Sequence, residues 1–156
     1  ITALHGMLYR LKHGNFKRMM TCQYALIDDI SGECIISNAG HCFPIIVSAD
    51  ARESRFEEMI STPAGIARKA IYDNRKLSLK PGETMILYSD GMIEATNSAG
   101  VPYGVERLLK LAQHGWHSDL QEYYQNLFKA NHAWSAKAED DITIVLVRLV
   151  PEVENA

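Results

Sequence analysis

Two apolar, strand-like segments each carry acidic residues at one end. Residues 84–89 run directly into Asp90, and residues 142–149 follow a short acidic run that includes Asp140. If the two strands are neighbours in one sheet, their acids come together, and two carboxylates without a counter-charge repel each other. A divalent cation resolves this conflict, because Mg²⁺ and Mn²⁺ prefer carboxylate oxygens and water as ligands.

Gly91 fits the same interpretation, because glycine lets the backbone turn away beside a crowded ion. One hypothesis is therefore a metal site at Asp90, Gly91 and Asp140. The other is that Asp90 and Gly91 form an ordinary turn, while Asp140 and Asp141 cap a solvated strand end, since acids are common in turns. Taken one at a time, the two acidic positions favour the ordinary explanation.

The pattern of apolar residues predicts more strands than helices in the first half of the chain and two helices late in it. We expect helices over residues 2–11, 104–113 and 118–133, and strands over residues 20–27, 33–37, 43–48, 76–79, 84–89 and 142–149. His13, Gly14 and Asn15 should end the first helix, and Ser118 should be the N-cap of the last one. Tight turns are expected at residues 28–32 and 80–83. This order indicates an α+β fold with antiparallel hairpins.

The composition suits one globular domain, with 47% hydrophobic residues among 156. A net charge of −3 and the lack of a basic block argue against nucleic acid as a partner. No apolar run approaches the ~18–20 residues that span a bilayer. Three cysteines without metal-ligand spacing fit a reducing compartment, so we expect a cytoplasmic location.

Four motifs follow one another with consistent spacing. They are "NAGHCFPI" (residues 38–45), "LKPGETMILYSDGMIEATN" (79–97), "YGVERL" (103–108) and "DDITIVLVRL" (140–149). Together they resemble the metal-dependent PPM (protein phosphatase 2C-like) family of serine/threonine phosphatases. The similarity is to its bacterial branch, which includes the stage II sporulation phosphatase and the phosphatases of sigma-factor regulation in stress responses.

The resemblance implies two antiparallel sheets packed face to face, with helices outside. It also implies two Mn²⁺ or Mg²⁺ ions held mainly by aspartates, and a water between them that attacks the phosphorus of a phosphoserine or phosphothreonine. The implied substrate is a phosphorylated regulatory protein of the anti-anti-sigma class.

The family's site residues transfer to this chain position by position. Asp90 and Asp140 match metal-ligand aspartates, and Gly91 matches the glycine that follows the first of them. Asp141 and His41 are assigned to the surroundings of the ligands, Asp141 as a strand-capping residue and His41 as a brace of the "AGH" turn. We interpret Glu94, the acid of the "DGxxEA" pattern, as a structural residue.

The family places a further metal aspartate and a Gly-His-Gly-like segment ahead of the matched region. We therefore expect residues 1–150 to be the C-terminal two-thirds of a phosphatase domain, N-terminally truncated, and residues 151–156 to be a polar tail. The chain is either a piece of a longer protein or a natural variant without the first half-site. Open sheet edges would favour a homodimer. The competing functions are a binding module on a degenerate phosphatase fold, and an α+β domain whose turn acids are incidental.

Overall fold

The computed structural model describes residues 1–11, 19–136 and 140–150 of the chain. The chain divides into two compact units, each with its own antiparallel sheet. The first unit comprises Ile1–His41 and Glu58–Leu79, and the second comprises Cys42–Glu57 and Lys80–Ala156. Within the described ranges, no helix combines the length and the apolar character needed to cross a membrane.

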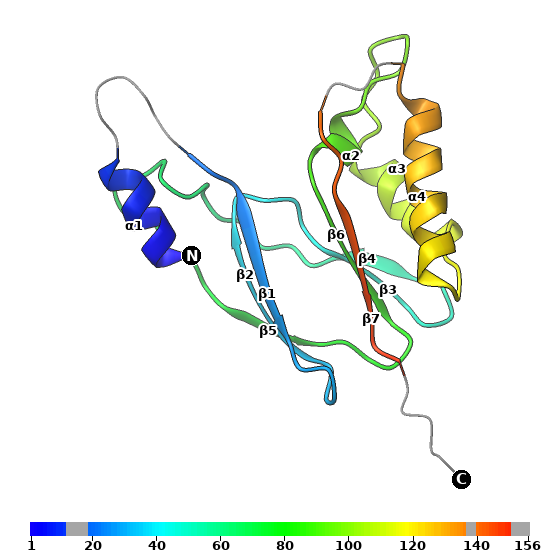
Figure 1. Ribbon diagram of the computed structural model, residues 1–156, viewed down its shortest axis with the longest axis horizontal. Helices are drawn as coiled ribbons and strands as arrows, with labels where there is room; N and C mark the ends of the chain where they lie inside the picture. Colours follow the sequence, from blue (N-terminus) through cyan, green and yellow to red (C-terminus); the bar gives the residue numbers. More distant parts are fainter. Residues whose placement is uncertain (12–18, 137–139, 151–156) are drawn as a thin grey trace. The chain divides into compact units, whose positions relative to one another are not determined.

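In its described residues, the first unit contains one helix and a three-stranded antiparallel sheet (Figure 1). Its elements are α1 (Thr2–Arg10), β1 (Cys22–Ile27), β2 (Glu33–Ala39) and β5 (Arg75–Ser78). The strands lie in the order β1-β2-β5, so β2 is central.

The hairpin between β1 and β2 is closed by one aspartate side chain. Asp28 Oδ1 accepts hydrogen bonds from the main-chain N–H groups of Ile30 (3.2 Å) and Ser31 (2.7 Å). The turn ends at Gly32, whose φ of 70° lies in the left-handed region that glycine enters without a Cβ clash. The turn predicted at residues 28–32 is therefore confirmed.

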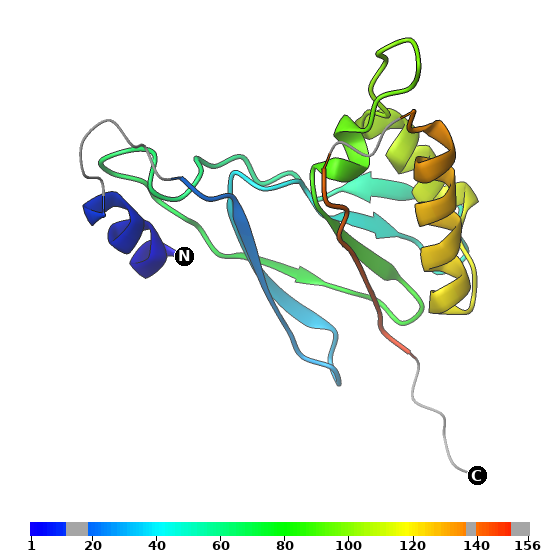
Figure 2. The same ribbon diagram turned by 45° about the horizontal axis from the view of Figure 1, so that its top comes forward.

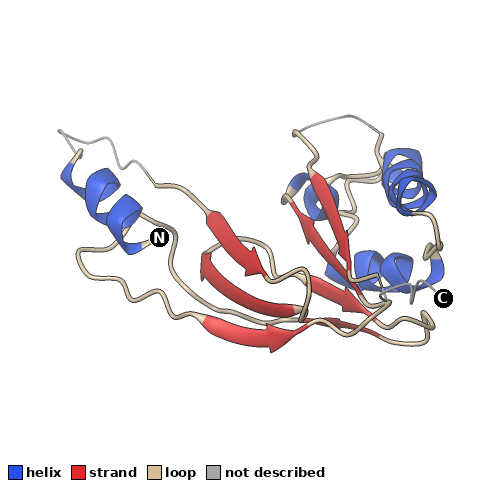
Figure 3. Ribbon diagram, turned by 60° about the horizontal axis from the view of Figure 1, so that its bottom comes forward, coloured by secondary structure: helices blue, strands red, loops and turns tan. Residues whose placement is uncertain are grey.

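The second unit holds a four-stranded antiparallel sheet in the order β4-β3-β6-β7. Its strands are β3 (Ile45–Val47), β4 (Ser54–Phe56), β6 (Thr84–Tyr88) and β7 (Ile144–Arg148), and its helices are α2 (Gly91–Glu94), α3 (Val105–His114) and α4 (Leu120–Trp134). Helix α3 contacts β3 and β4, and α4 contacts β7. Figures 2 and 3 show both helices on the same side of this sheet.

The core of the second unit lies between that sheet and the helices. Residues four apart supply it, such as Leu108 and Ala112 on α3 and Tyr123 and Leu127 on α4, which is the spacing of one helix face. The complete buried cluster is Ile45, Val47, Ile86, Tyr88, Met92, Tyr103, Leu108, Ala112, Tyr123 and Leu127.

The expected α+β fold with two antiparallel sheets and helices is confirmed, and the differences are local. Helix α4 starts one residue later than expected, because Asp119 is its N-cap and accepts from the Glu122 N–H at 2.9 Å. The choice of Ser118 as the cap is therefore wrong. Strand β4 (Ser54–Phe56) and helix α2 (Gly91–Glu94) were not among the expected elements. The helix end predicted at residues 13–15 lies outside the described residues, as does the polar tail.

Arg148 on β7 ties the sheet of the second unit to the connection between α3 and α4. Its Nε donates to Thr84 Oγ1 at 2.7 Å, and its two terminal nitrogens donate to the main-chain oxygens of Ser118 (2.6 Å) and His117 (2.9 Å). The guanidinium also lies 4.9 Å from the centre of the Trp116 ring. A planar fork with several donors can make all these contacts at once, whereas a lysine ammonium cannot.

Replacing this arginine by lysine keeps the charge and removes the fork. We expect Arg148→Lys to lower the free energy of unfolding by roughly 2 kcal/mol, because at least two hydrogen bonds from a charged group are lost. Arg52→Lys is the control, since the Arg52 side chain is 84% exposed and forms an ion pair with Asp50 on the surface. Urea denaturation followed by circular dichroism gives the comparison, and equal midpoints for the two variants would contradict the assignment.

Candidate metal centre

The pairing of β6 with β7 brings together two segments that are remote in the sequence. Tyr88 lies opposite Ile144 at the end of this antiparallel ladder. Ser89 continues the contact beyond it: its N–H donates to Thr143 O at 3.0 Å, and its Oγ donates to Asp141 O at 3.0 Å and accepts from the Thr143 N–H at 2.8 Å. The residue after β6 is thereby fixed against the residues before β7.

Asp90 is the N-cap of the short helix α2, and the last residue of this helix is a third acid, Glu94. The main-chain oxygen of Asp90 accepts from the N–H groups of Ile93 (2.8 Å) and Glu94 (2.9 Å). Its side chain accepts from the Gly91 N–H at 3.1 Å. Residues four apart lie on one face of a helix, so Glu94 projects on the same side as Asp90.

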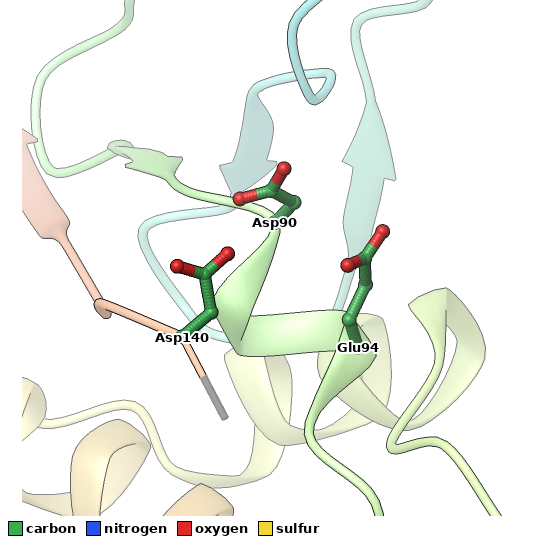
Figure 4. Close-up of side chains that lie close together, drawn as sticks. All are labelled: Asp90, Glu94 and Asp140. Carbon is green, nitrogen blue, oxygen red and sulfur yellow. The ribbon is translucent and has the colours of Figure 1, made fainter. Parts of the chain in front are cut away.

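Three carboxylates therefore converge: Asp90, Glu94 and Asp140. One oxygen from each lies within 4.8 Å of the others, and all three residues are exposed. Figure 4 shows the three side chains on one side of α2. Among the ion pairs between described residues, none involves these acids. The cluster is thus a concentration of negative charge without a counter-charge from residues 1–11, 19–136 or 140–150.

The size and chemistry of this cluster fit a hard divalent cation. An ion with oxygen ligands at ~2.1 Å holds opposite ligands ~4 Å apart, which is close to the spread of the three oxygens. Mg²⁺ and Mn²⁺ keep several waters when protein carboxylates bind them, and the exposure of the cluster leaves room for those waters.

Gly91 allows the two acidic segments to approach each other. A Cβ atom at this position would lie 2.7 Å from the main-chain oxygen of Asp141 and 3.3 Å from the Ile142 side chain. Gly91 has no positive φ, so contact rather than backbone conformation excludes a side chain here. The glycine therefore sets the spacing between Asp90 and Asp140.

The two residues assigned to the surroundings of the ligands have different places. Asp141 contributes its main-chain oxygen to Ser89, and its own N–H donates to Asp140 Oδ1 at 2.8 Å. His41 belongs to the first unit, where its main-chain N–H and oxygen both bind the Asn38 side chain, at 2.9 and 3.0 Å. Asn38 therefore braces the "AGH" turn, with the His41 main chain as its partner.

Burial and the negative charge of the cluster both contribute to a raised pKa of the Cys42 thiol. Burial, followed by the charges of Asp90 and Glu94, raises the pKa of Cys42 to about 11. The thiol is consequently protonated at neutral pH, which disfavours its use as a nucleophile.

Glu94, interpreted from the sequence as a structural residue, lies beside the two predicted ligands. Its carboxylate lies in the acidic cluster, a proximity that the sequence did not predict. The spacing in "DGMIE" would have indicated this if a helix had been predicted there, because Asp90 and Glu94 are four residues apart. The structure therefore adds Glu94 to the candidate ligands Asp90 and Asp140.

Comparison with known proteins identifies the family. Residues 1–150 match the Stage II sporulation protein E (SpoIIE) family, and the chain belongs to it. It is 27% identical over 100 residues to Protein IcfG of Synechocystis sp., an alignment that covers 64% of this chain and 16% of IcfG.

Solved structures with low sequence identity share the fold. The SiaA-PP2C domain of Pseudomonas aeruginosa superposes with a TM-score of 0.76 at 21% identity, over 94% of this chain and 56% of that one. The phosphatase domain of the cell fate determinant SpoIIE from Bacillus subtilis, in a manganese-presoaked form, has a TM-score of 0.68 at 18% identity, over 97% and 74%. The chain thus spans little more than half of the SiaA domain and a small part of IcfG.

A methyl group at Gly91 tests the close approach directly. We expect Gly91→Ala to push the Asp141 main chain away, to separate Asp90 from Asp140 and to weaken Mn²⁺ binding at least ~10-fold. Gly6→Ala is the matched control: Gly6 is also helical, and its nearest neighbour would be Arg10 at 3.8 Å, so a small gain in stability is expected. Titration calorimetry with Mn²⁺ measures both, and unchanged affinity in folded Gly91→Ala would contradict this role.

Neutralising Asp90 should have opposite effects on Mn²⁺ binding and on the stability of the metal-free protein. We expect Asp90→Asn to leave the metal-free melting temperature equal or higher, because repulsion in the empty cluster falls. The stabilisation by added Mn²⁺ should drop by at least ~1.4 kcal/mol, which corresponds to a tenfold weaker affinity. Asp29→Asn, a change at an exposed turn acid, is the control. Thermal denaturation with and without Mn²⁺ measures this, and a full Mn²⁺ response in Asp90→Asn would exclude Asp90 as a ligand.

Proposed function

We propose that this chain is part of a metal-dependent protein-serine/threonine phosphatase. The observation that carries the proposal is the convergence of Asp90, Glu94 and Asp140 within 4.8 Å, without a protein counter-charge among the described residues. Membership of the SpoIIE family and the fold shared with phosphatase domains support the same reading. An incidental set of turn acids would not need Gly91 to hold the two segments in contact.

The chain's own residues have separate tasks in this function. The carboxylates of Asp90 and Asp140 would hold Mn²⁺ or Mg²⁺, with Glu94 beside them, and Gly91 and Ser89 keep the two segments in register. When bound, such ions lower the pKa of a coordinated water and neutralise charge on phosphoryl oxygens. Asp90 also binds the Gly91 N–H, which orients its carboxylate at the start of α2.

The proposed substrate is a phosphoserine or phosphothreonine on a regulatory protein of the anti-anti-sigma class. The acidic cluster is exposed, which suits a phosphorylated side chain carried on the surface of a folded partner. The sigma-factor assignment comes from the motif resemblance in the bacterial branch of the family. Sigma-factor signalling would then be the cellular process.

We further propose that the 156-residue chain alone has little turnover. Its three clustered acids suffice for one ion, whereas two-ion hydrolysis needs a further anchoring acid. The chain spans 56% of the SiaA domain, which leaves room for such a segment in a complete catalytic domain. Among the described strands, none pairs with the outer edges of β1, β4, β5 or β7, so association through a sheet edge, as a homodimer, is the accompanying proposal.

A binding module without catalysis is the alternative. It would have no need to retain three mutually repelling carboxylates, since each could be replaced by a neutral residue with a gain in stability. Retention of Asp90, Glu94 and Asp140 therefore favours the enzyme.

Hydrolysis of a phosphoserine protein distinguishes these proposals. We expect Mn²⁺-dependent turnover from a protein that contains this chain and the preceding family segment, and at least ~100-fold less from residues 1–156 alone. Asp90→Asn in the longer protein should abolish turnover, and Asp29→Asn should leave it unchanged. Turnover that survives chelation would sink the metal-dependent mechanism, and robust turnover by the 156-residue chain would show that it needs no further acid.

A further inference from the structure

Helix α2 depends on a side chain from a distant helix. With only four residues, Gly91–Glu94, it cannot satisfy its own main-chain oxygens, because the last four carbonyls of any helix lack intrahelical partners. The oxygen of Met92 accepts instead from Asn131 Nδ2 on α4, at 2.7 Å and across 39 residues of sequence. Met92 itself is buried, so water does not offer an alternative donor.

Asn131 stands where α4 otherwise buries apolar residues. Tyr123, Leu127 and Asn131 are four residues apart and are all fully buried. A leucine would extend this apolar stripe, so the polar residue is unexpected on packing grounds alone.

The amide is also only half satisfied. Its Nδ2 binds Met92, whereas its Oδ1 is buried and has no hydrogen-bond partner in the described part of the chain. Leaving a buried acceptor unpaired costs about 1–3 kcal/mol. Packing alone does not explain why a residue with this energetic cost stands at position 131. The hydrogen bond that its Nδ2 donates to α2 does explain it.

The hydrogen bond between Asn131 and Met92 restrains the helix that carries Glu94 and is capped by Asp90, two acids of the cluster. Helix α2 carries Glu94 at one end and begins at Asp90, so its orientation decides where both carboxylates lie relative to Asp140. A cavity of about 290 Å³ is lined by Asn131 together with Glu94 and Asp140 of the acidic cluster. The hydrogen bond from Asn131 restrains α2 from the side of α4. It adds to the buried Met92 side chain and to the Gly104 N–H, which donates to Ile93 O at 2.9 Å.

We propose that Asn131 is a positioning residue for the metal centre: it holds α2 so that Asp90 and Glu94 face Asp140. It does not touch the ion, and it acts through the main chain of Met92. The inference rests on the metal site of the proposed function and adds to it a residue that sets metal affinity.

The test compares two asparagines of the same helix. Asn131→Leu removes the donor and the unpaired acceptor together. Asn126→Leu is the matched control, because Asn126 Nδ2 also donates to a main-chain oxygen, that of Gly115 at 2.9 Å, away from α2. Binding of Mn²⁺ to the 156-residue chain is measured by electron paramagnetic resonance from the loss of the aqueous Mn²⁺ signal, so the readout does not need catalysis.

We expect Asn131→Leu to bind Mn²⁺ at least ~10-fold more weakly than the wild type, the size typical for partners that orient metal ligands. Asn126→Leu should bind with wild-type affinity. If Asn131→Leu fails to fold cooperatively, Asn131→Ser replaces it, since a serine hydroxyl is too short to reach Met92, and the same loss is expected.

The outcomes separate the positioning role from the metal site itself. Wild-type affinity in a folded Asn131 variant would overturn the positioning role and leave the proposed function standing. Equal losses in the Asn131 and Asn126 variants would also overturn it, because the effect would then be a general one on α4. No binding of Mn²⁺ by the wild-type chain would overturn the metal centre and this inference with it.

Discussion

The antiparallel pairing of β6 with β7 is the interaction on which the candidate site depends. The ladder ends with Tyr88 opposite Ile144, and the side chain of Ser89 continues it by binding the main chain of Asp141 and Thr143. Without this continuation, Asp90 and Asp140 would stand on two free segments. With it, they are held together by the same hydrogen bonds that complete the sheet edge.

The site that this pairing forms holds three negatively charged carboxylates close together. Asp90, Glu94 and Asp140 repel one another, and Gly91 lacks a side chain, which lets their segments meet. The buried Oδ1 of Asn131 has no hydrogen-bond partner among the residues that the structure describes. The repulsion among the acids and the unpaired oxygen both reduce the stability of the metal-free protein. Their concentration in one small region is what a site built for a cation would show, since the ion removes the repulsion that the protein alone cannot.

The sequence predicted the parts of this arrangement that lie in regular or repeated patterns. Asp90 and Asp140 were singled out because each marks the end of an apolar strand. The order of strands and turns indicated an α+β fold with antiparallel hairpins, and the resemblance to the PPM family implied the two antiparallel sheets. The proximity of Glu94 to these two acids was not predicted, because a helix of four residues is too short to show a period. Asn131 could not be found at all, because its contact with Met92 crosses 39 residues and leaves no local pattern. The N-cap of α4 was missed by one residue, since Ser118 and Asp119 are both good caps and only the backbone conformation chooses between them.

The central claim is that the ends of β6 and β7 form a metal centre, and anomalous X-ray scattering at the manganese edge tests it most directly. Crystals of the chain grown with Mn²⁺ should show an anomalous peak at ~2.1 Å from carboxylate oxygens of both Asp90 and Asp140. The peak should disappear in Asp90→Asn while the β6–β7 ladder stays intact. A peak elsewhere, or no peak at saturating Mn²⁺ with the three carboxylates still converged, would contradict the account.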